Sequence, residues 1–171
     1  MLVRLKGGSG ASVSQGLAFE LKMVARDSLL RRSNYTGKMQ NWRILLAESH
    51  PELRQNTVKT LAEMPGLNLV AKVANGWDVM FTCSQLKPDI ILPDYSLPGL
   101  SGTEVARLIK RGLPQIRVVM LLADGENDDG HVKASEQCGA CACLVKSHLA
   151  GELPALLGRL ELASGGEGVS G

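Results

Sequence analysis

Residues 88–102 read PDIILPDYSLPGLSG, and this stretch decides the fold. Residues 90–92 form a short, unbroken apolar run, and Asp94 follows it closely. A Pro-Gly pair comes next, and residues 102–111 then take up the helical spacing of apolar side chains. An apolar run of this length, bounded by turn residues, is typical of a strand buried on both faces. The stretch therefore predicts a strand, a turn and a helix, with Asp94 at the carboxyl end of the strand.

The same alternation of strand and helix extends outward in both directions. We predict strands at residues 44–47, 67–73, 90–92, 118–122 and 142–145, and helices at residues 51–64, 76–86, 102–111, 128–138 and 149–162. Apolar strands that alternate with helices favour a parallel sheet covered on both faces. Because crossovers between parallel strands are right-handed, the sheet is predicted to be doubly wound.

Periodicity also predicts the inward faces. We expect the core-facing helix positions to include Leu53, Thr57, Leu61, Met64, Val105, Leu108, Ile109, Leu153, Leu156, Leu157 and Leu160. The strand at residues 67–73 alternates with period 2, which predicts that its odd-numbered residues share one face. Two S-x-x-E motifs, at Ser49 and Ser101, predict helix N-caps.

Composition excludes several classes of protein. The chain has 171 residues, of which 44% are hydrophobic and 21% are charged, as in globular domains and unlike disordered chains. No apolar run approaches the ~20 residues that span a bilayer, and the first residues do not form a secretory signal. Four cysteines are too few for a disulfide scaffold. We therefore expect a cytoplasmic protein with reduced thiols and no membrane contact.

Charge divides the chain into two parts. Residues 1–41 carry seven Lys or Arg and two acids, which gives +5, whereas residues 42–171 carry twelve and fifteen, which gives −3. The acidic part argues against nucleic acid as a partner. We expect residues 1–41 to be a flexible basic leader with a short amphipathic helix at 17–32, and residues 164–171 to be a flexible tail. Three methionines are alternative translation starts: Met1, Met23 and Met39.

Charged side chains follow three of the predicted strands. Glu48 comes after the first strand, Asp94 after the third and Lys146 after the fifth. Because ligands of open α/β sheets bind beyond the carboxyl ends of the strands, these side chains mark a candidate site. Two carboxylates suit Mg²⁺, a carboxylate can attack a phosphoryl group, and a lysine can neutralise a phosphate.

With these motifs, the chain resembles the receiver domain of bacterial two-component response regulators, especially receivers that precede LuxR-type DNA-binding domains. The resemblance runs over residues 42–163. It rests on PDIILPDYSLPGLSG, with support from RILLAESHPELR at 43–54, ANGWDV at 74–79 and GACACLVK at 139–146. It implies a flavodoxin-like fold with five parallel strands in the order 2-1-3-4-5, which agrees with the pattern read from the residues.

The resemblance also implies roles for individual residues. Asp94 matches the aspartate that accepts a phosphoryl group from a histidine kinase or a phosphotransfer protein. Glu48 matches the first of two acids after the first strand, and Lys146 matches the lysine that contacts the phosphoryl oxygens. Glu48 and Asp94 would hold Mg²⁺, which neutralises charge during the transfer.

Four residues depart from the family pattern. Ser49 replaces the second acid, so Mg²⁺ binding is expected to be weak. Leu122 replaces the Ser or Thr whose hydroxyl binds the phosphoryl group, and Cys143 replaces an aromatic residue that reports the switch. Pro93 cannot donate to the ladder of an inner strand.

The sequence thus predicts a stand-alone, atypical receiver, which is not an enzyme and acts on an unknown output protein through protein–protein contact. A homodimer is left open. One alternative is a degenerate pseudo-receiver that works without phosphorylation, and a lower-ranked one is a flavodoxin-like enzyme. Three cysteines form a C-x-x-C-x-C cluster: Cys138, Cys141 and Cys143. We interpret them as small residues that fill a helix-to-strand turn, and a metal site is the less favoured alternative.

Overall fold

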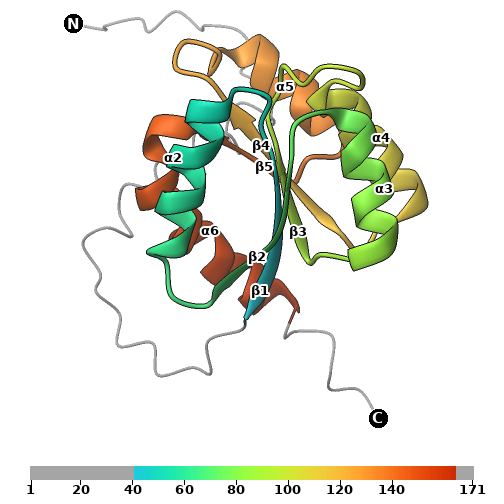
Figure 1. The fold of residues 1–171 in the computed structure, drawn as a ribbon. Helices are drawn as coiled ribbons and strands as arrows, with labels where there is room; N and C mark the ends of the chain where they lie inside the picture. Colours follow the sequence, from blue (N-terminus) through green and yellow to red (C-terminus); the bar gives the residue numbers. More distant parts are fainter. Residues whose placement is uncertain (1–40, 165–171) are drawn as a thin grey trace, which may run out of the picture. The chain divides into compact units, whose positions relative to one another are not determined.

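The computed structural model describes residues 41–164, and its centre is a sheet of five parallel strands (Figure 1). The strands are β1 Trp42–Ala47, β2 Leu67–Val73, β3 Ile90–Pro93, β4 Arg117–Leu122 and β5 Ala142–Val145. Their order in the sheet is β2-β1-β3-β4-β5, and every neighbouring pair is parallel. The predicted flavodoxin-like topology is confirmed.

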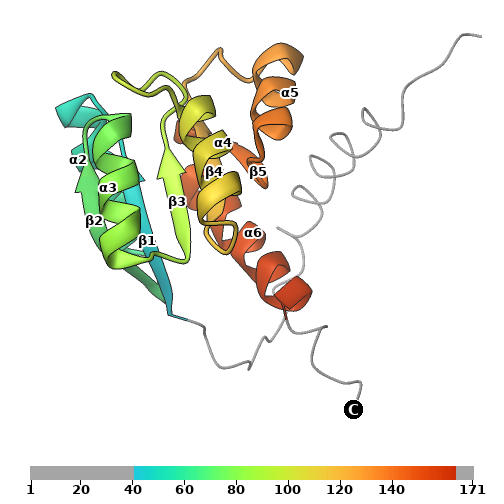
Figure 2. The same ribbon diagram turned by 90° about the vertical axis from the view of Figure 1, so that its right-hand side faces the viewer.

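Helices cover both faces of this sheet (Figures 1 and 2). They are α2 Pro51–Ala62, α3 Gly76–Leu86, α4 Gly102–Gly112, α5 Asp129–Cys138 and α6 Leu149–Ser164, with a short 3₁₀ helix, η1 Lys146–His148, before the last. Side chains of α2 and α6 pack against one face, and those of α3, α4 and α5 pack against the other. The core therefore consists of two apolar clusters separated by the sheet.

Two predicted core positions are wrong. Leu53 of α2 is 42% exposed and Leu108 of α4 is 39% exposed. The first turn of α2 follows the end of β1, so Leu53 lies at the carboxyl edge, where the strands have ended. In α4 the buried stripe runs through Val105, Ala106 and Ile109, and Leu108 falls to one side of it.

Strand β2 contains an irregularity that its alternating sequence does not predict. Ile44 of β1 pairs with Leu69, but the next residue of β1, Leu45, pairs with Ala71, so Val70 is an extra residue. One extra residue turns every later side chain to the other face. Leu69 accordingly packs in the cluster under α2 and α6, whereas Ala71 packs under α3 and α4.

Pro93 explains a gap in the ladder between β3 and β4. The two strands pair at Ile90 and Ile91, and pairing resumes only at the Asp94–Leu121 bridge. Proline has no N–H to donate at this point in an inner strand. It is tolerated because the backbone directly after it is held: the Asp94 N–H donates to the Ala47 carbonyl at 2.8 Å.

The two S-x-x-E motifs behave differently. The Ser101 hydroxyl accepts from the Glu104 N–H, and the Glu104 carboxylate accepts from the Ser101 N–H, which confirms the predicted capping box of α4. The predicted Ser49 cap is wrong: His50 is the N-cap residue of α2, and its side chain makes no capping hydrogen bond. The helix starts one residue later than the motif suggests, with Pro51 in its first turn.

The predicted leader, its helix at 17–32, the alternative start positions and the tail after residue 164 lie outside the described residues. In the described part of the chain, no helix is long and apolar enough to cross a membrane.

Candidate functional site

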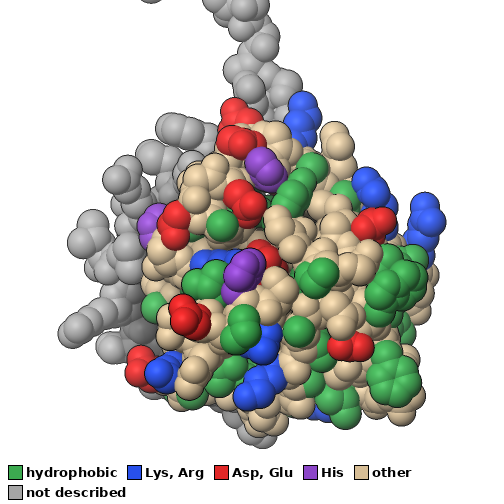
Figure 3. All heavy atoms as spheres, turned by 45° about the horizontal axis from the view of Figure 1, so that its top comes forward, with side chains coloured by type: hydrophobic (Ala, Val, Ile, Leu, Met, Phe, Trp, Pro, Cys, Tyr) green, Lys and Arg blue, Asp and Glu red, His purple; other side chains and the backbone are tan. Residues whose placement is uncertain are grey.

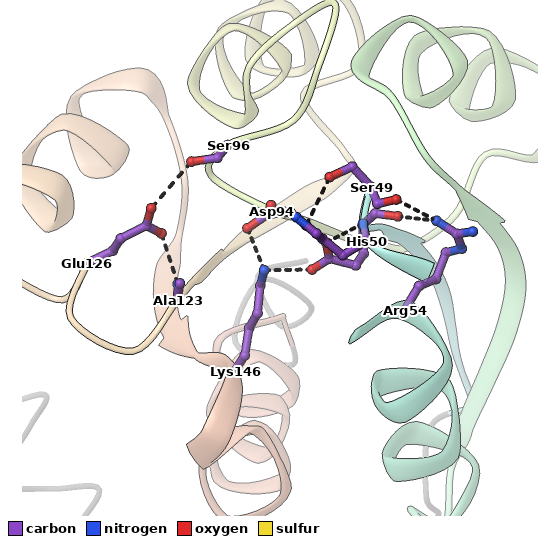
Figure 4. A network of polar contacts seen from close by, with 9 residues as sticks. Ser49, His50, Arg54, Asp94, Ser96, Ala123, Glu126 and Lys146 are labelled. Carbon is purple, nitrogen blue, oxygen red and sulfur yellow. Dashed lines mark hydrogen bonds and ion pairs between the residues drawn. The ribbon is translucent and has the colours of Figure 1, made fainter. Parts of the chain in front are cut away.

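Three charged side chains meet at the carboxyl edge of the sheet (Figure 4). Glu48 follows β1, Asp94 follows β3 and Lys146 follows β5. The Lys146 Nζ lies 2.6 Å from the Glu48 Oε2 and 2.8 Å from the Asp94 Oδ1. The structure thus brings together the residues that the sequence placed after separate strands, and the lysine bridges the two carboxylates.

Both carboxylates are buried. Glu48 is 0% exposed and Asp94 is 3% exposed, whereas the Lys146 side chain is 12% exposed. Figure 3 looks onto this edge, where acidic, basic and histidine side chains stand close together in the middle of the face. A group that reacts with Asp94 must therefore approach through the loops around it.

Burial and the lysine act against each other on the pKa values of the site. Burial raises the pKa of Glu48, but the hydrogen bond and charge of Lys146 and the His50 N–H outweigh it, and the pKa is lowered. Burial also raises the pKa of Asp94, and here the effect prevails over Lys146, helped by the negative charges of Glu48 and Glu126. Burial lowers the pKa of Lys146, but its bonds to the two carboxylates raise it above the ordinary lysine value.

The loop after β1 holds Glu48 through contacts that the sequence did not reveal. The His50 N–H donates to the Glu48 Oε1 at 3.0 Å, and the ring Nδ1 lies 3.3 Å from the same oxygen. The Arg54 Nη1 donates to the Glu48 carbonyl at 2.6 Å and to the Ser49 carbonyl at 3.2 Å. The Ser49 hydroxyl itself contacts the His50 ring, at 3.3 Å. An arginine one turn into a helix is a weak sequence signal, and so its role was missed.

A second group of contacts, also missed, surrounds the turn at residues 123–126. The Glu126 carboxylate accepts from the Ala123 N–H at 2.9 Å and from the Ser96 hydroxyl at 3.4 Å. The Ser147 hydroxyl donates to the Asp124 carboxylate at 2.5 Å. Side chains therefore tie this turn both to the loop after β3 and to the segment that carries Lys146.

The two residues at the departing switch positions lie in the core or beside it. Leu122 is 1% exposed and packs in the cluster under α3, α4 and α5. Cys143 is half-buried, and burial raises the pKa of its thiol to about 11, although a Ser135 hydrogen bond opposes this. Neither side chain offers the hydroxyl or the aromatic ring found in the family pattern.

The loop after Asp94 is packed against α3. Gly99 has φ +78°, and a Cβ there would lie 2.7 Å from the Trp77 Cδ1. Gly102 is equally confined, since a Cβ would lie 2.4 Å from the Asp94 carbonyl oxygen. Glycine is therefore required at both positions, and the loop is held close to its neighbours.

Comparison with known proteins decides the family. The family model described as the response regulator receiver domain matches residues 44–157, which is more than half of the chain. The chain belongs to the response regulator receiver domain family. It is the receiver domain of a two-component system, with a signalling fold that is not a classical enzyme family.

Relatives support this assignment. The receiver is 31% identical to the response regulator GacA of Pseudomonas aeruginosa over 104 residues, which are 61% of this chain and 48% of GacA. It is 30% identical to UvrY of Escherichia coli over 84 residues, which are 49% of this chain and 38% of UvrY. The chain spans less than half the length of these two relatives.

Solved structures show the same fold. The receiver domain of the response regulator NarL from Mycobacterium tuberculosis superposes with a TM-score of 0.65 at 24% identity, covering 71% of this chain and 98% of that one. The response regulator domain of CheB from Thermotoga maritima gives 0.62 at 22% identity, covering 72% and 96%.

Receiver domains generally bind Mg²⁺ at the phosphorylation site, and the donor types at this edge fit that ion. The Glu48 Oε2 is buried and, apart from its ion contact with Lys146, accepts no hydrogen bond. Mg²⁺ is commonly held by one or two carboxylates together with water. Across residues 41–164, however, no group of three or more His, Cys, Asp or Glu side chains is placed to hold a metal, and this includes the cysteine cluster.

Proposed function

We propose that Asp94 accepts a phosphoryl group from a histidine kinase or a phosphotransfer protein. The observation that carries the proposal is the Lys146 ammonium, which lies 2.8 Å from the Asp94 Oδ1 at the carboxyl edge of the sheet. This lysine is placed to neutralise one charge on an incoming phosphoryl oxygen. Asp94 is also the central carboxylate of this edge, between the strands that carry Glu48 and Leu122.

In the proposed transfer, a carboxylate oxygen of Asp94 attacks the phosphorus of a phosphohistidine. A new P–O bond forms while the P–N bond breaks, and the electron pair of the P–N bond stays on the imidazole. The other ring nitrogen of the phosphohistidine carries a proton, so the imidazole leaves as a neutral group. The product is an aspartyl phosphate. The Asp94 carboxylate must be ionised to attack, so its raised pKa makes it a less available nucleophile at acidic pH.

Bound Mg²⁺ would supply charge neutralisation, with Glu48 and Asp94 as its protein ligands. We propose that this binding is weak, because Ser49 brings no second carboxylate to the loop after β1. Lys146 also contributes a positive charge to the same two carboxylates, so a metal ion competes with a contact that already exists.

We further propose that output occurs by protein–protein contact over α5, β5 and α6. Because Leu122 cannot donate a hydrogen bond to the phosphoryl group, phosphorylation is expected to change this surface less than in receivers that have a hydroxyl at this position. The same observation favours the second candidate, a pseudo-receiver that binds its partner without phosphorylation. The buried Leu122 and the Ser49 hydroxyl, which lies 3.3 Å from the His50 Nδ1, support that alternative.

Phosphorylation with a small-molecule donor separates the two candidates. We expect acetyl phosphate with Mg²⁺ to add one phosphoryl group by intact mass, and the addition to disappear in Asp94→Asn. Asp89→Asn is the matched control, since it removes a carboxylate five residues earlier and should leave the label in place. Label on another residue would contradict the proposed acceptor. No label at all would also contradict it and would favour the pseudo-receiver.

A further inference from the structure

The turn between β4 and α5 places a negative charge at the edge of the site. Residues 123–126 form a tight turn in which the Glu126 N–H donates to the Ala123 carbonyl at 3.0 Å. Gly125 has φ +95°, which suits the third position of a type II turn. The turn brings the Glu126 side chain back onto the Ala123 N–H at 2.9 Å. Two hydrogen bonds therefore join Ala123 and Glu126, one between main-chain groups and one from the Ala123 N–H to the Glu126 side chain.

The Glu126 carboxylate occupies two hydrogen-bond donors on the loops beside Asp94, the Ala123 N–H and the Ser96 hydroxyl. The Ala123 N–H lies just beyond Leu121, the residue of β4 that forms a bridge with Asp94. Figure 4 shows Glu126 directed at Ala123 and Ser96, on the side of Asp94 away from Ser49 and Arg54. Its charge reaches Asp94, whose pKa it helps to raise. The side chain at position 122 has no hydroxyl, so the backbone N–H of Ala123, directly after β4, is a hydrogen-bond donor that remains at this end of the strand.

We propose that the Glu126 carboxylate is an internal anionic ligand of the Ala123 N–H, and that it competes with a phosphoryl group on Asp94 for that donor. This inference rests on the proposed function of Asp94. Modification of Asp94 then requires Glu126 to give up the Ala123 N–H and the Ser96 hydroxyl. Glu126 is accordingly an autoinhibitory residue, which slows phosphorylation in the resting domain.

Electrostatics act in the same direction. Glu48 and Asp94 both contact Lys146, and the charge of Glu126 adds to the negative charge that already surrounds Asp94. A phosphoryl group adds further negative charge, so repulsion of Glu126 increases when Asp94 is modified. Once the phosphoryl group is attached, this repulsion keeps Glu126 away from the Ala123 N–H.

The competition also gives phosphorylation a route to α5. Glu126 stands two residues before Asp128, whose side chain caps α5 by accepting from the His131 N–H at 2.9 Å. The His131 ring in turn lies edge-to-face against Tyr95, the residue after Asp94, with ring centroids 4.8 Å apart. Release of Glu126 frees the segment that leads into this helix, without a hydroxyl at position 122.

Two variants of Glu126 test the proposal by a graded response. Glu126→Gln keeps the shape and removes the charge, whereas Glu126→Ala removes the acceptor as well. We expect the rate of Asp94 phosphorylation by acetyl phosphate with Mg²⁺, followed by intact mass, to rise several-fold in Glu126→Gln and roughly tenfold in Glu126→Ala. The matched control is Asp129→Asn, which removes an exposed charge three residues later and should leave the rate unchanged.

A second measurement reports the donor directly. In amide NMR spectra, we expect the Ala123 resonance to move in Glu126→Ala before any phosphoryl donor is added, and its hydrogen exchange to accelerate. After modification of Asp94, wild type and Glu126→Ala should share one Ala123 resonance position, since the phosphoryl group then occupies the donor in both.

The outcomes separate the two proposals. If wild-type Asp94 is phosphorylated but the Glu126 variants react at the wild-type rate, the competition is wrong and the acceptor assignment stands. If Asp129→Asn accelerates the reaction as much as Glu126→Ala, the rate depends on the overall negative charge of this region, and the proposed competition at the Ala123 N–H is wrong. If neither wild type nor any variant is phosphorylated at Asp94, both proposals fail.

Discussion

Lys146 balances two buried carboxylates, and its removal leaves them facing each other without a cation. Breaking a buried ion pair in this way costs about 3 kcal/mol or more in the free energy of unfolding. We predict that Lys146→Met is destabilised by about that amount near pH 7, measured by urea unfolding. Lys133→Met removes an exposed lysine of α5 and is expected to change stability by less than about 0.5 kcal/mol.

Removal of Lys146 should also reverse the pH dependence of the contribution that Glu48 makes to stability. In wild type the pKa of Glu48 is lowered, so its stabilising contribution is present at neutral pH and is lost as the pH falls through the folded-state value. Without Lys146, burial and mutual repulsion raise the pKa of both carboxylates above their values in the unfolded chain. Their ionised forms then destabilise the fold, and this cost decreases as the pH falls and the groups become protonated. Lys146→Met should therefore recover part of its stability between about pH 7 and about pH 5. An equal deficit at both pH values would contradict charge balance as the cause.

Ser49 determines how many carboxylates can surround a metal ion. We predict that Ser49→Asp binds Mg²⁺ at least about tenfold more tightly than wild type, because a second acid joins Glu48 on the same loop. Calorimetric titration measures the difference, and Ser96→Asp on the opposite loop controls for added charge. Tight binding by wild type, with no gain in Ser49→Asp, would show that the serine does not limit the metal site.

Helix starts show what a motif can and cannot predict at the scale of one element. Ser49 and Ser101 both begin an S-x-x-E motif, but only Ser101 caps its helix. We predict that Ser101→Ala lowers the free energy of unfolding by about 1 kcal/mol, whereas Ser49→Ala lowers it by less than about 0.5 kcal/mol. Thermal and urea unfolding of the two single variants check this. Equal losses would mean that the Ser101 cap is not a significant source of stability.

The strands and helices were predictable because their apolar periods are clear, and five of each are found where the sequence indicated. The errors have local causes. Val70 is apolar like its neighbours Leu69 and Ala71, so nothing in the residue types signals that it is the extra residue of a bulge. Leu53 and Leu108 are apolar at near-helical spacing, but their burial depends on where each helix meets the sheet, which spacing alone does not determine.

The candidate site follows the same rule. Glu48, Asp94 and Lys146 each end a recognisable strand, and parallel strands end at one edge, so their meeting was predictable. Glu126 and Arg54 were not predictable, because each acts by returning to a backbone group a few residues away. Such contacts depend on the turn geometry, and Gly125 was the one local signal for it.

At the scale of the whole molecule, both core clusters are built from residues within 42–160. The described residues contain all five strands of this sheet and helices on both of its faces. We predict that deletion of residues 1–38 changes the midpoint of thermal unfolding by less than about 2 °C, because the charge and composition of this segment predict that it lies outside the folded domain. Calorimetry of the two chains gives the comparison.

A matched truncation at the other end gives the contrast. Ending the chain before Leu153 removes three core side chains of α6 and should abolish cooperative unfolding: Leu153, Leu156 and Leu157. A large loss of stability on removing residues 1–38 would instead show that this segment is part of the folded domain.

The Trp77 indole packs against Gly99, so tryptophan fluorescence can report on the loop after Asp94. The chain has two tryptophans, and Trp42 is 2% exposed while Trp77 is 63% exposed. Iodide should therefore quench Trp77 and spare Trp42, and Trp77→Phe should leave a blue-shifted emission that iodide hardly affects. Quenching that persists in Trp77→Phe would contradict the assignment. Because Trp77 packs against the loop that follows the acceptor, the receiver carries its own fluorophore for following changes beside Asp94 in real time, without a label.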